Sequence, residues 1–148
     1  MSADLDPRVV ARIHAAYGRQ GLFNHLGARV GAIGKGRLEM SLDFRPELSQ
    51  QNGFFHGGAI GFLVDNATAG AAGTVLPPDS AILTAEYKVN MLAPAIPGRL
   101  TARAEVVKAG RTLTTVEAKV FVQPAEGPEK LVAIGLATMA VVPAEKVA

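Results

Sequence analysis

One acidic residue of the chain lies in surroundings that disfavour a charge. Asp65 stands in the middle of the apolar stretch 57–75, close to Phe62, Val64 and Ala67. Burying an unpaired carboxylate there costs much free energy, so a polar group must meet it. Asp65 either binds a backbone or basic group inside the fold, or serves as a general base or nucleophile in a cleft. The residues alone leave both interpretations open.

Three residues at the start of the same stretch suggest a partner for this chemistry. His56, Gly57 and Gly58 precede what we expect to be a helix. The first backbone N–H groups of a helix have no intrahelical acceptor, and the helix dipole favours negative charge beside them. Such an N–H can stabilise the oxyanion that forms when a carbonyl is attacked. An ordinary glycine turn, with His56 making one hydrogen bond, explains the same residues.

The spacing between the two features predicts more than one subunit. Gly57 and Asp65 are eight positions apart, which is about 12 Å along a helix. One chain cannot therefore place both groups on one carbonyl. A second copy of the helix, antiparallel across a two-fold axis, would bring the Gly57 of one chain near the Asp65 of the other. We expect a homodimer or a homotetramer.

The sequence lacks the residues that several other kinds of catalytic, metal or nucleotide site require. The chain has no cysteine, which excludes a thiol nucleophile and a cysteine-bound metal. His14 and His25 form no metal-ligand spacing with His56. No serine lies in a nucleophile elbow, and no glycine-rich loop suits a nucleotide phosphate. We therefore expect no metal and no cofactor.

Charge and hydropathy narrow the possible partners. The net charge of +2 arises from 15 basic and 13 acidic residues without a dense basic run, so we expect no nucleic acid. The N-terminus lacks the apolar core of a signal peptide. The apolar segment 57–76 is interrupted by Asp65 and is rich in glycine, and the apolar segment 131–142 is too short to cross a bilayer. We therefore expect no membrane span. The interpretation is a cytoplasmic protein.

The elements that must position these residues follow from periodicity. Asp6 and Pro7 suit a helix start, and Gly18 or Gly21 suits its end. Residues 22–25 and 46–55 are expected to be loops. Residues 57–73 are expected to form a helix buried nearly all round, since its many small residues suit a closely wrapped sheet. Alternating or apolar runs predict strands over residues 28–33, 37–44, 81–92, 98–108, 111–123 and 130–142.

This order of elements predicts one α+β domain over residues 1–148, in which an antiparallel sheet curls around one long central helix. The turn between the first two strands is expected at residues 34–36, and a tight hairpin is expected at Ala109 and Gly110.

The segment Gln50-Gln-Asn-Gly-Phe-Phe-His-Gly-Gly58, followed by Asp65-Asn-Ala67, resembles the hot-dog fold thioesterases of the PaaI-like group. In these families an Asn or Gln precedes H-G-G, and an Asp or Glu follows eight residues after the first glycine. Residues 84–95 and 108–113 also resemble the group. The resemblance covers a core of residues 28–142 and leaves the helix and loop of residues 1–26 outside it.

The resemblance implies a hot-dog fold and the hydrolysis of acyl-CoA thioesters. The Gly57 N–H would bind the thioester carbonyl, and Asp65 of the facing subunit would activate water or attack the carbonyl. Gln50 and His56 would help to hold the carbonyl or the water, and Thr84 would orient Asp65. Further residues expected to contact the substrate are Asn52, Phe55, Gly58 and Arg111.

Two other functions remain open at this point. A hydratase or dehydratase of acyl thioesters on the same fold would use a catalytic histidine paired with an acid, and the mid-helix position of Asp65 argues against it. A non-catalytic module that binds or senses acyl-CoA would need no turnover. Phe54, Phe55, Phe62 and Met91 would suit either an acyl pocket or the core, so the acyl group stays undetermined.

Overall fold

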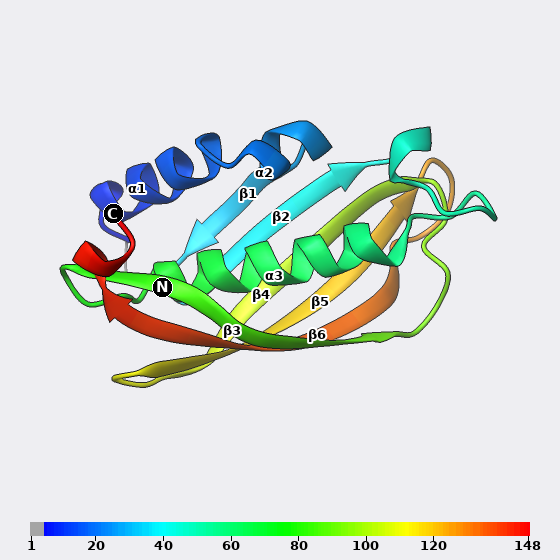
Figure 1. The fold of residues 1–148 in the computed structure, drawn as a ribbon. Coiled ribbons are helices and arrows are strands. Elements are labelled where there is room, and N and C mark those ends of the chain that lie inside the picture. Colours follow the sequence, from blue (N-terminus) through cyan, green and yellow to red (C-terminus); the bar gives the residue numbers. More distant parts are fainter. Residues whose placement is uncertain (1–4) are drawn as a thin grey trace.

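The fold is built from six strands and a long helix, seen in a computed structural model that describes residues 5–148 (Figure 1). The sheet order is β1-β2-β4-β5-β6-β3, and every neighbouring pair is antiparallel. The strands are β1 (Arg29–Gly34), β2 (Arg37–Asp43), β3 (Ser80–Met91), β4 (Gly98–Ala109), β5 (Leu113–Pro124) and β6 (Lys130–Pro143). The expected strands are confirmed, with ends that differ by no more than two residues.

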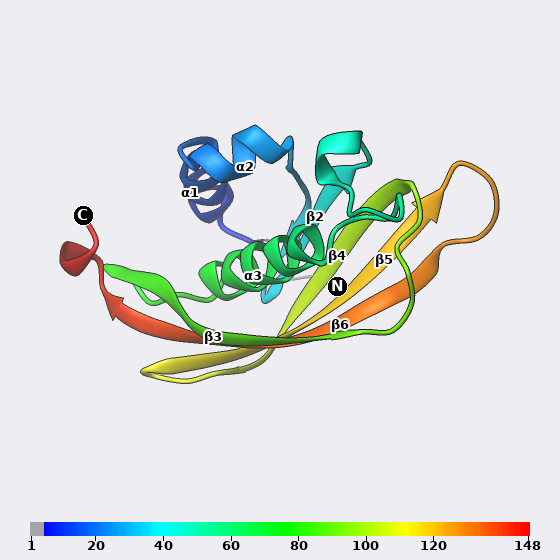
Figure 2. The same ribbon diagram turned by 45° about the vertical axis from the view of Figure 1, so that its right-hand side comes forward.

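The central helix α3 (Gly57–Gly73) lies along the concave face of the curved sheet, as Figures 1 and 2 show from two directions. Most of its side chains are buried, and it contacts β2, β3, β4, β5 and β6. The α+β hot-dog architecture expected from the sequence is therefore confirmed. A short 3-10 turn, Pro46–Leu48, precedes α3, and another, Ala144–Lys146, ends the chain.

Small residues let α3 and the sheet approach closely. A Cβ atom on Gly135 of β6 would stand 2.5 Å from Val64 Cγ1 of α3, which no real side chain tolerates. On the sheet side, alternate residues of β2 such as Leu38, Met40 and Leu42 are fully buried, as a half-buried strand requires. The helix thus takes the place of a second layer over the sheet.

The N-terminal region forms two helices rather than one helix and a loop. Helix α1 (Pro7–Gly18) begins as expected, with the Asp6 side chain accepting a hydrogen bond from the Arg8 N–H. The expected loop at residues 22–25 is wrong, because these residues lie in helix α2 (Gly21–Leu26), which ends at Gly27 with φ 71°. Six residues make fewer than two turns, too short for a helical period to be recognised.

Strand β3 forms one edge of the sheet. It pairs with β6, and within residues 5–148 its other side has no strand partner. Leu83, Tyr87 and Met91 of this strand are exposed apolar side chains. Over the same residues no helix is long and apolar enough to cross a membrane.

Candidate active site

The Asp65 carboxylate is met by a hydroxyl group. Asp65 is half-buried on α3, and the Thr84 Oγ1–H of β3 donates a hydrogen bond of 2.8 Å to its Oδ1. Among residues 5–148, no basic side chain forms an ion pair with Asp65 and no group donates to its second oxygen. The carboxylate is therefore held at one oxygen, and the other oxygen is available to a substrate or water.

A β-bulge in β3 aims Thr84 at the helix. Thr84 pairs with Met139 and Glu86 pairs with Thr138, so Ala85 is an extra residue in the strand. Tyr87 pairs with Ala137, which lies on the same face of β6 as Met139. In a regular strand, residues three positions apart such as Thr84 and Tyr87 would point to opposite faces, because side chains alternate along it. The bulge places both side chains on the face toward α3. With it, Thr84 reaches Asp65, and the Tyr87 ring lies against Gly61 of α3.

The first turn of α3 presents one open backbone donor. His56 is the N-cap residue, and its Nδ1 accepts a hydrogen bond of 2.8 Å from the Gly58 N–H. Within residues 5–148, no acceptor binds the Gly57 N–H. A Cβ atom on Gly58 would stand 2.9 Å from His56 Nδ1, so this cap requires a glycine there. Of the two N–H groups at the helix start, the structure leaves that of Gly57 for a ligand.

A cavity of about 470 Å³ opens beside Gly57. Apart from Gln50, its walls are mainly apolar, and they come from the loop before α3, the first turn of α3 and the segment after β3. The lining residues are Gln50, Phe54, Phe55, Gly57, Ile60, Met91, Leu92, Ala93, Pro94 and Ala95. Phe55 is also a core residue, 3% exposed and packed edge-on against Phe44 at 5.0 Å.

The structure divides the expected site residues into separate groups. Gly57 and Gln50 share the cavity, whereas neither Asp65 nor Thr84 lines it. Gln50 Oε1 accepts a hydrogen bond from the Asn52 backbone N–H, and the exposed Asn52 side chain lies outside the cavity lining. Phe62 is buried in the core and does not line the cavity either.

Arg111 lies far from this cavity. It belongs to the turn between β4 and β5, at the opposite end of α3 from Gly57 (Figure 1). One chain therefore does not bring Arg111 together with the other expected substrate-binding residues.

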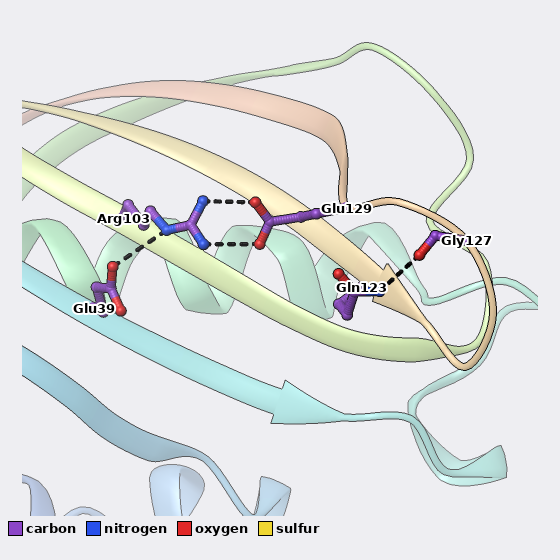
Figure 3. Close-up of polar contacts among 5 residues, drawn as sticks. All are labelled: Glu39, Arg103, Gln123, Gly127 and Glu129. Carbon is purple, nitrogen blue, oxygen red and sulfur yellow. Dashed lines mark hydrogen bonds and ion pairs between the residues drawn. The ribbon is translucent and has the colours of Figure 1, made fainter.

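A larger groove, of about 580 Å³, lies on the face of the sheet that points away from α3. Its charged side chains neutralise each other, as in the ion pairs Arg37–Glu105 and Lys119–Glu117. Arg103 donates to both carboxylate oxygens of Glu129 at 2.8 and 2.7 Å, and to Glu39 at 3.2 Å (Figure 3). Its guanidinium also covers the Phe121 ring.

The Glu129 hydrogen bonds raise the pKa of Arg103, and the same bonds lower the pKa of Glu129. Gln123 closes the adjoining loop by donating to the Gly127 carbonyl at 3.0 Å (Figure 3). The hydrogen bonds to Glu39 and Glu129 engage all three guanidinium nitrogens of Arg103, so its charge is already neutralised within the chain. In the described part of the chain, no cluster of three or more His, Asp or Glu side chains is arranged to hold a metal ion.

Ile60 and Tyr17 are among the contributors to the site region that the sequence does not single out. Ile60 lines the cavity one helical turn after Gly57, but its sequence context is that of any core residue. Tyr17 of α1 hydrogen-bonds to the backbone of α3 next to Asp65. In the sequence, Tyr17 is one of several apolar residues that follow Val9 and Ile13 at helical spacing, which indicates a helix and no more.

Comparisons with known proteins agree with this fold. The family model of the thioesterase superfamily matches residues 52–128, more than half of the chain. The 1,4-dihydroxy-2-naphthoyl-CoA hydrolase of Listeria monocytogenes is 29% identical over 121 residues, covering 82% of this chain and 95% of the relative.

Two solved structures show the same fold. A thioesterase family protein from Silicibacter pomeroyi has a TM-score of 0.88 and 36% identity, covering 91% of this chain and 98% of that one. The E. coli PaaI protein from the phenylacetic acid degradation operon has a TM-score of 0.83 and 21% identity, covering 94% and 96%. The chain therefore belongs to the thioesterase superfamily, as a thioester hydrolase with the PaaI-like hot-dog fold.

Proposed function

We propose that the protein hydrolyses acyl-CoA thioesters at a site shared by two copies of the chain. The Gly57 N–H of one copy binds the thioester oxygen, and Asp65 of the other copy acts as general base or nucleophile. The observation that carries this proposal is the position of the two groups on one unbroken helix. Gly57 opens into the cavity, and Asp65 lies outside it, about 12 Å further along the helix axis.

The chemistry follows from what each group can do. As a general base, Asp65 takes a proton from water while the water oxygen bonds to the carbonyl carbon. The resulting oxyanion accepts a hydrogen bond from the Gly57 N–H, which the helix dipole strengthens. When the carbonyl re-forms, the C–S bond breaks, and the CoA sulfur takes up the proton that Asp65 removed from water. As a nucleophile, Asp65 would instead attack the carbonyl carbon and expel the CoA thiolate, which leaves a mixed anhydride that water then cleaves to the free acid and the Asp65 carboxylate.

The remaining residues have supporting roles in this proposal. Thr84 holds one oxygen of Asp65 and so directs the other toward the substrate. Gln50, in the same cavity as Gly57, is placed to help hold the carbonyl or the water. His56 keeps the helix start in shape through its bond to Gly58, and its ring remains exposed beside the substrate. Asn52 and Arg111 would contact CoA only across the subunit boundary.

Strand β3 is the surface on which we propose the second copy binds. Its free edge can pair with the same strand of another chain across a two-fold axis. Its exposed side chains Leu83, Tyr87 and Met91 would be covered by such pairing. This arrangement would also lay the two α3 helices side by side, which the shared site requires. We expect the homo-oligomer to be cytoplasmic.

The cavity beside Gly57 favours an apolar acyl group. Phe54, Ile60 and Met91 offer aromatic and aliphatic walls, with no charged side chain among the lining residues. The name of the Listeria relative, a naphthoyl-CoA hydrolase, supports CoA as the carrier and an aryl group as one candidate. A panel of aryl and aliphatic acyl-CoAs, followed by thiol release, identifies the preferred acyl group.

Mixing two inactive variants tests the shared site. Asp65→Asn removes the base and is expected to lower kcat by about 10²–10⁴-fold. Gly57→Pro removes the N–H at the first helical position, where proline is tolerated. His56 is already extended, with ψ 140°, as a residue before proline must be. Refolding the two variants together would give mixed dimers with one complete site, and about a quarter of wild-type activity should return.

Gly57→Ala is the matched control, because it keeps the N–H and adds only a methyl group. That methyl would meet Met91 Cε at 3.4 Å, an ordinary contact. Activity near wild type for Asp65→Asn alone would refute the assigned base. Inactive mixtures made from well-folded variants would refute the sharing between copies. Enoyl-CoA hydration without thiol release would instead indicate a hydratase.

A further inference from the structure

The turn of α3 that carries Asp65 is tied by side chains at several backbone carbonyls. Asn66 Nδ2 donates to the Phe62 carbonyl at 3.1 Å. Thr68 Oγ1 lies 2.7 Å from the Val64 carbonyl and 3.0 Å from that of Asp65. These bonds all come from α3 itself, so they stiffen the turn without fixing where it lies relative to the sheet.

One further bond to this turn comes from another element. The Tyr17 hydroxyl of α1 donates to the Asn66 carbonyl at 2.5 Å, across 49 positions of sequence. Tyr17 is 4% exposed, and its ring stacks on Phe23 at 5.1 Å. A Cβ atom on Gly70 would stand 2.5 Å from this hydroxyl. The close approach of α1 to α3 therefore requires glycine at position 70.

The electrostatic surroundings of Tyr17 agree with its place beside the site. Burial raises the pKa of the phenol first of all, and the negative charge of Asp65 raises it further, while a hydrogen bond from the Gly70 backbone acts in the opposite direction. The hydroxyl thus stays protonated and remains a donor. Arg12, also on α1, donates to the Gly73 carbonyl at 2.9 Å, so α1 holds α3 at two carbonyls.

We infer that Tyr17 is a positioning residue, which sets the place of Asp65 by holding the α3 turn through the Asn66 carbonyl. This inference rests on the proposed function of Asp65. The half of α3 that follows Asn66 is rich in alanine and glycine. Small side chains make few contacts that resist sliding along the helix axis, so a directional contact beside Asp65 helps to fix its axial position. Misplacement by about 1 Å can cost a reaction roughly 10²-fold. Thr84 holds the carboxylate on one side of α3, and Tyr17 holds the backbone on the other.

Tyr17→Phe removes the hydroxyl and keeps the ring stacked on Phe23. We expect kcat to fall about 10-fold or more. KM for the same acyl-CoA should stay within about two-fold, because α1 contributes no residue to the cavity lining and uniform substrate binding is unchanged. Gly70→Ala is the second variant, since its methyl group would stand 2.5 Å from the same hydroxyl. The methyl would also stand 2.6 Å from Leu38 Cδ1, so the urea midpoint of unfolding is measured together with kcat.

Arg12→Met is the matched control, because it breaks the other contact between α1 and α3 at the far end of the helix. Both variants should lower the urea midpoint of unfolding, but kcat should fall only in Tyr17→Phe. Equal effects of the two variants on kcat would show that Tyr17 acts through general stability, and would overturn the inference.

The double variant Tyr17→Phe/Asp65→Asn separates this inference from the proposed function. If Tyr17 acts through Asp65, adding Tyr17→Phe leaves the residual kcat of Asp65→Asn unchanged. A further fall of the same factor as in the wild-type background would overturn the inference. If Asp65→Asn alone is fully active, the proposed function fails. If Asp65→Asn is inactive and Tyr17→Phe keeps wild-type kcat, only the inference fails.

Discussion

The Thr84 hydroxyl contacts one oxygen of the Asp65 carboxylate and lies 3.5 Å from Met139 Sδ on its other side. A thioether is a weak acceptor, so the hydroxyl proton is directed to the carboxylate. A half-buried carboxylate with one strong donor has a fixed orientation and a free second oxygen. That combination suits a base that must meet a water molecule at a defined place.

Thr84→Val tests the hydrogen bond from Thr84 to Asp65 without changing the shape of the side chain. Valine matches threonine in size but cannot donate, so the carboxylate would lose its orientation and kcat should fall about 10-fold or more. Thr84→Ser keeps the donor and should retain most of the activity. Steady-state kinetics with one acyl-CoA compare the two. Equal kcat for the valine and serine variants would remove Thr84 from the proposed site.

Among single residues, the sequence indicates those that stand in unusual surroundings as candidates for the site. Asp65 stands out because a carboxylate interrupts an apolar run, and Gly57 because glycines precede a helix. Thr84 was identified only through the family resemblance. Tyr17 gave no signal, because a tyrosine on the apolar stripe of a helix looks like any core aromatic residue and its acceptor is a distant backbone carbonyl.

The packing of α3 on β6 depends on a residue without a side chain at position 135. Gly135 faces Val64 so closely that a methyl group would clash with Val64 Cγ1, at 2.5 Å. Val64 is itself fully buried, so it has little room to move. The contact fixes the distance between the helix and the strand that pairs with β3.

Gly135→Ala should therefore lower the free energy of unfolding by about 1–3 kcal/mol, the usual cost of overpacking a core. Urea denaturation measures this loss. Gly73→Ala is the control, because its added methyl meets no atom within 4 Å. Val64→Ala combined with Gly135→Ala should recover part of the loss. Full stability of Gly135→Ala alone would contradict the close packing.

Helices and strands that are long enough to repeat their hydrophobic period several times could be predicted from the sequence. The α3 bounds and the sheet strands follow from an apolar run and from alternation over seven or more residues in most strands. Helix α2 was missed because six residues show no clear period. The β3 bulge was missed because one extra residue shifts the alternation without any distinctive residue type, and only the pairing with β6 reveals it.

At the scale of the whole molecule, β3 is the surface that a single chain leaves incomplete. Its edge lacks a partner within residues 5–148, and half of the Leu83 side chain is exposed. The groups expected to act on one thioester lie on the same helix but do not meet in the same cavity. Association through this edge would join them.

Leu83→Lys should separate the copies, because two lysines near the two-fold axis repel each other and lose an apolar contact. Light scattering after gel filtration should report a smaller particle, and thioesterase activity should be lost together with the association. Leu22→Lys on α2 is the matched control, since Leu22 is 58% exposed, close to the 50% of Leu83. A monomeric Leu83→Lys variant with full activity would contradict the shared site.

The bulge at Ala85 has a consequence for unwanted assembly. A long, flat, apolar edge strand is a template on which any extended chain can add and grow into fibrils. The extra residue bends and twists β3 in its middle, so an arbitrary strand finds no continuous ladder of donors and acceptors. A second copy of β3 carries the same irregularity. We therefore expect the bulge that brings Thr84 toward the helix to make this edge accept a second copy of β3 more readily than an arbitrary strand, and to disfavour the growth of fibrils.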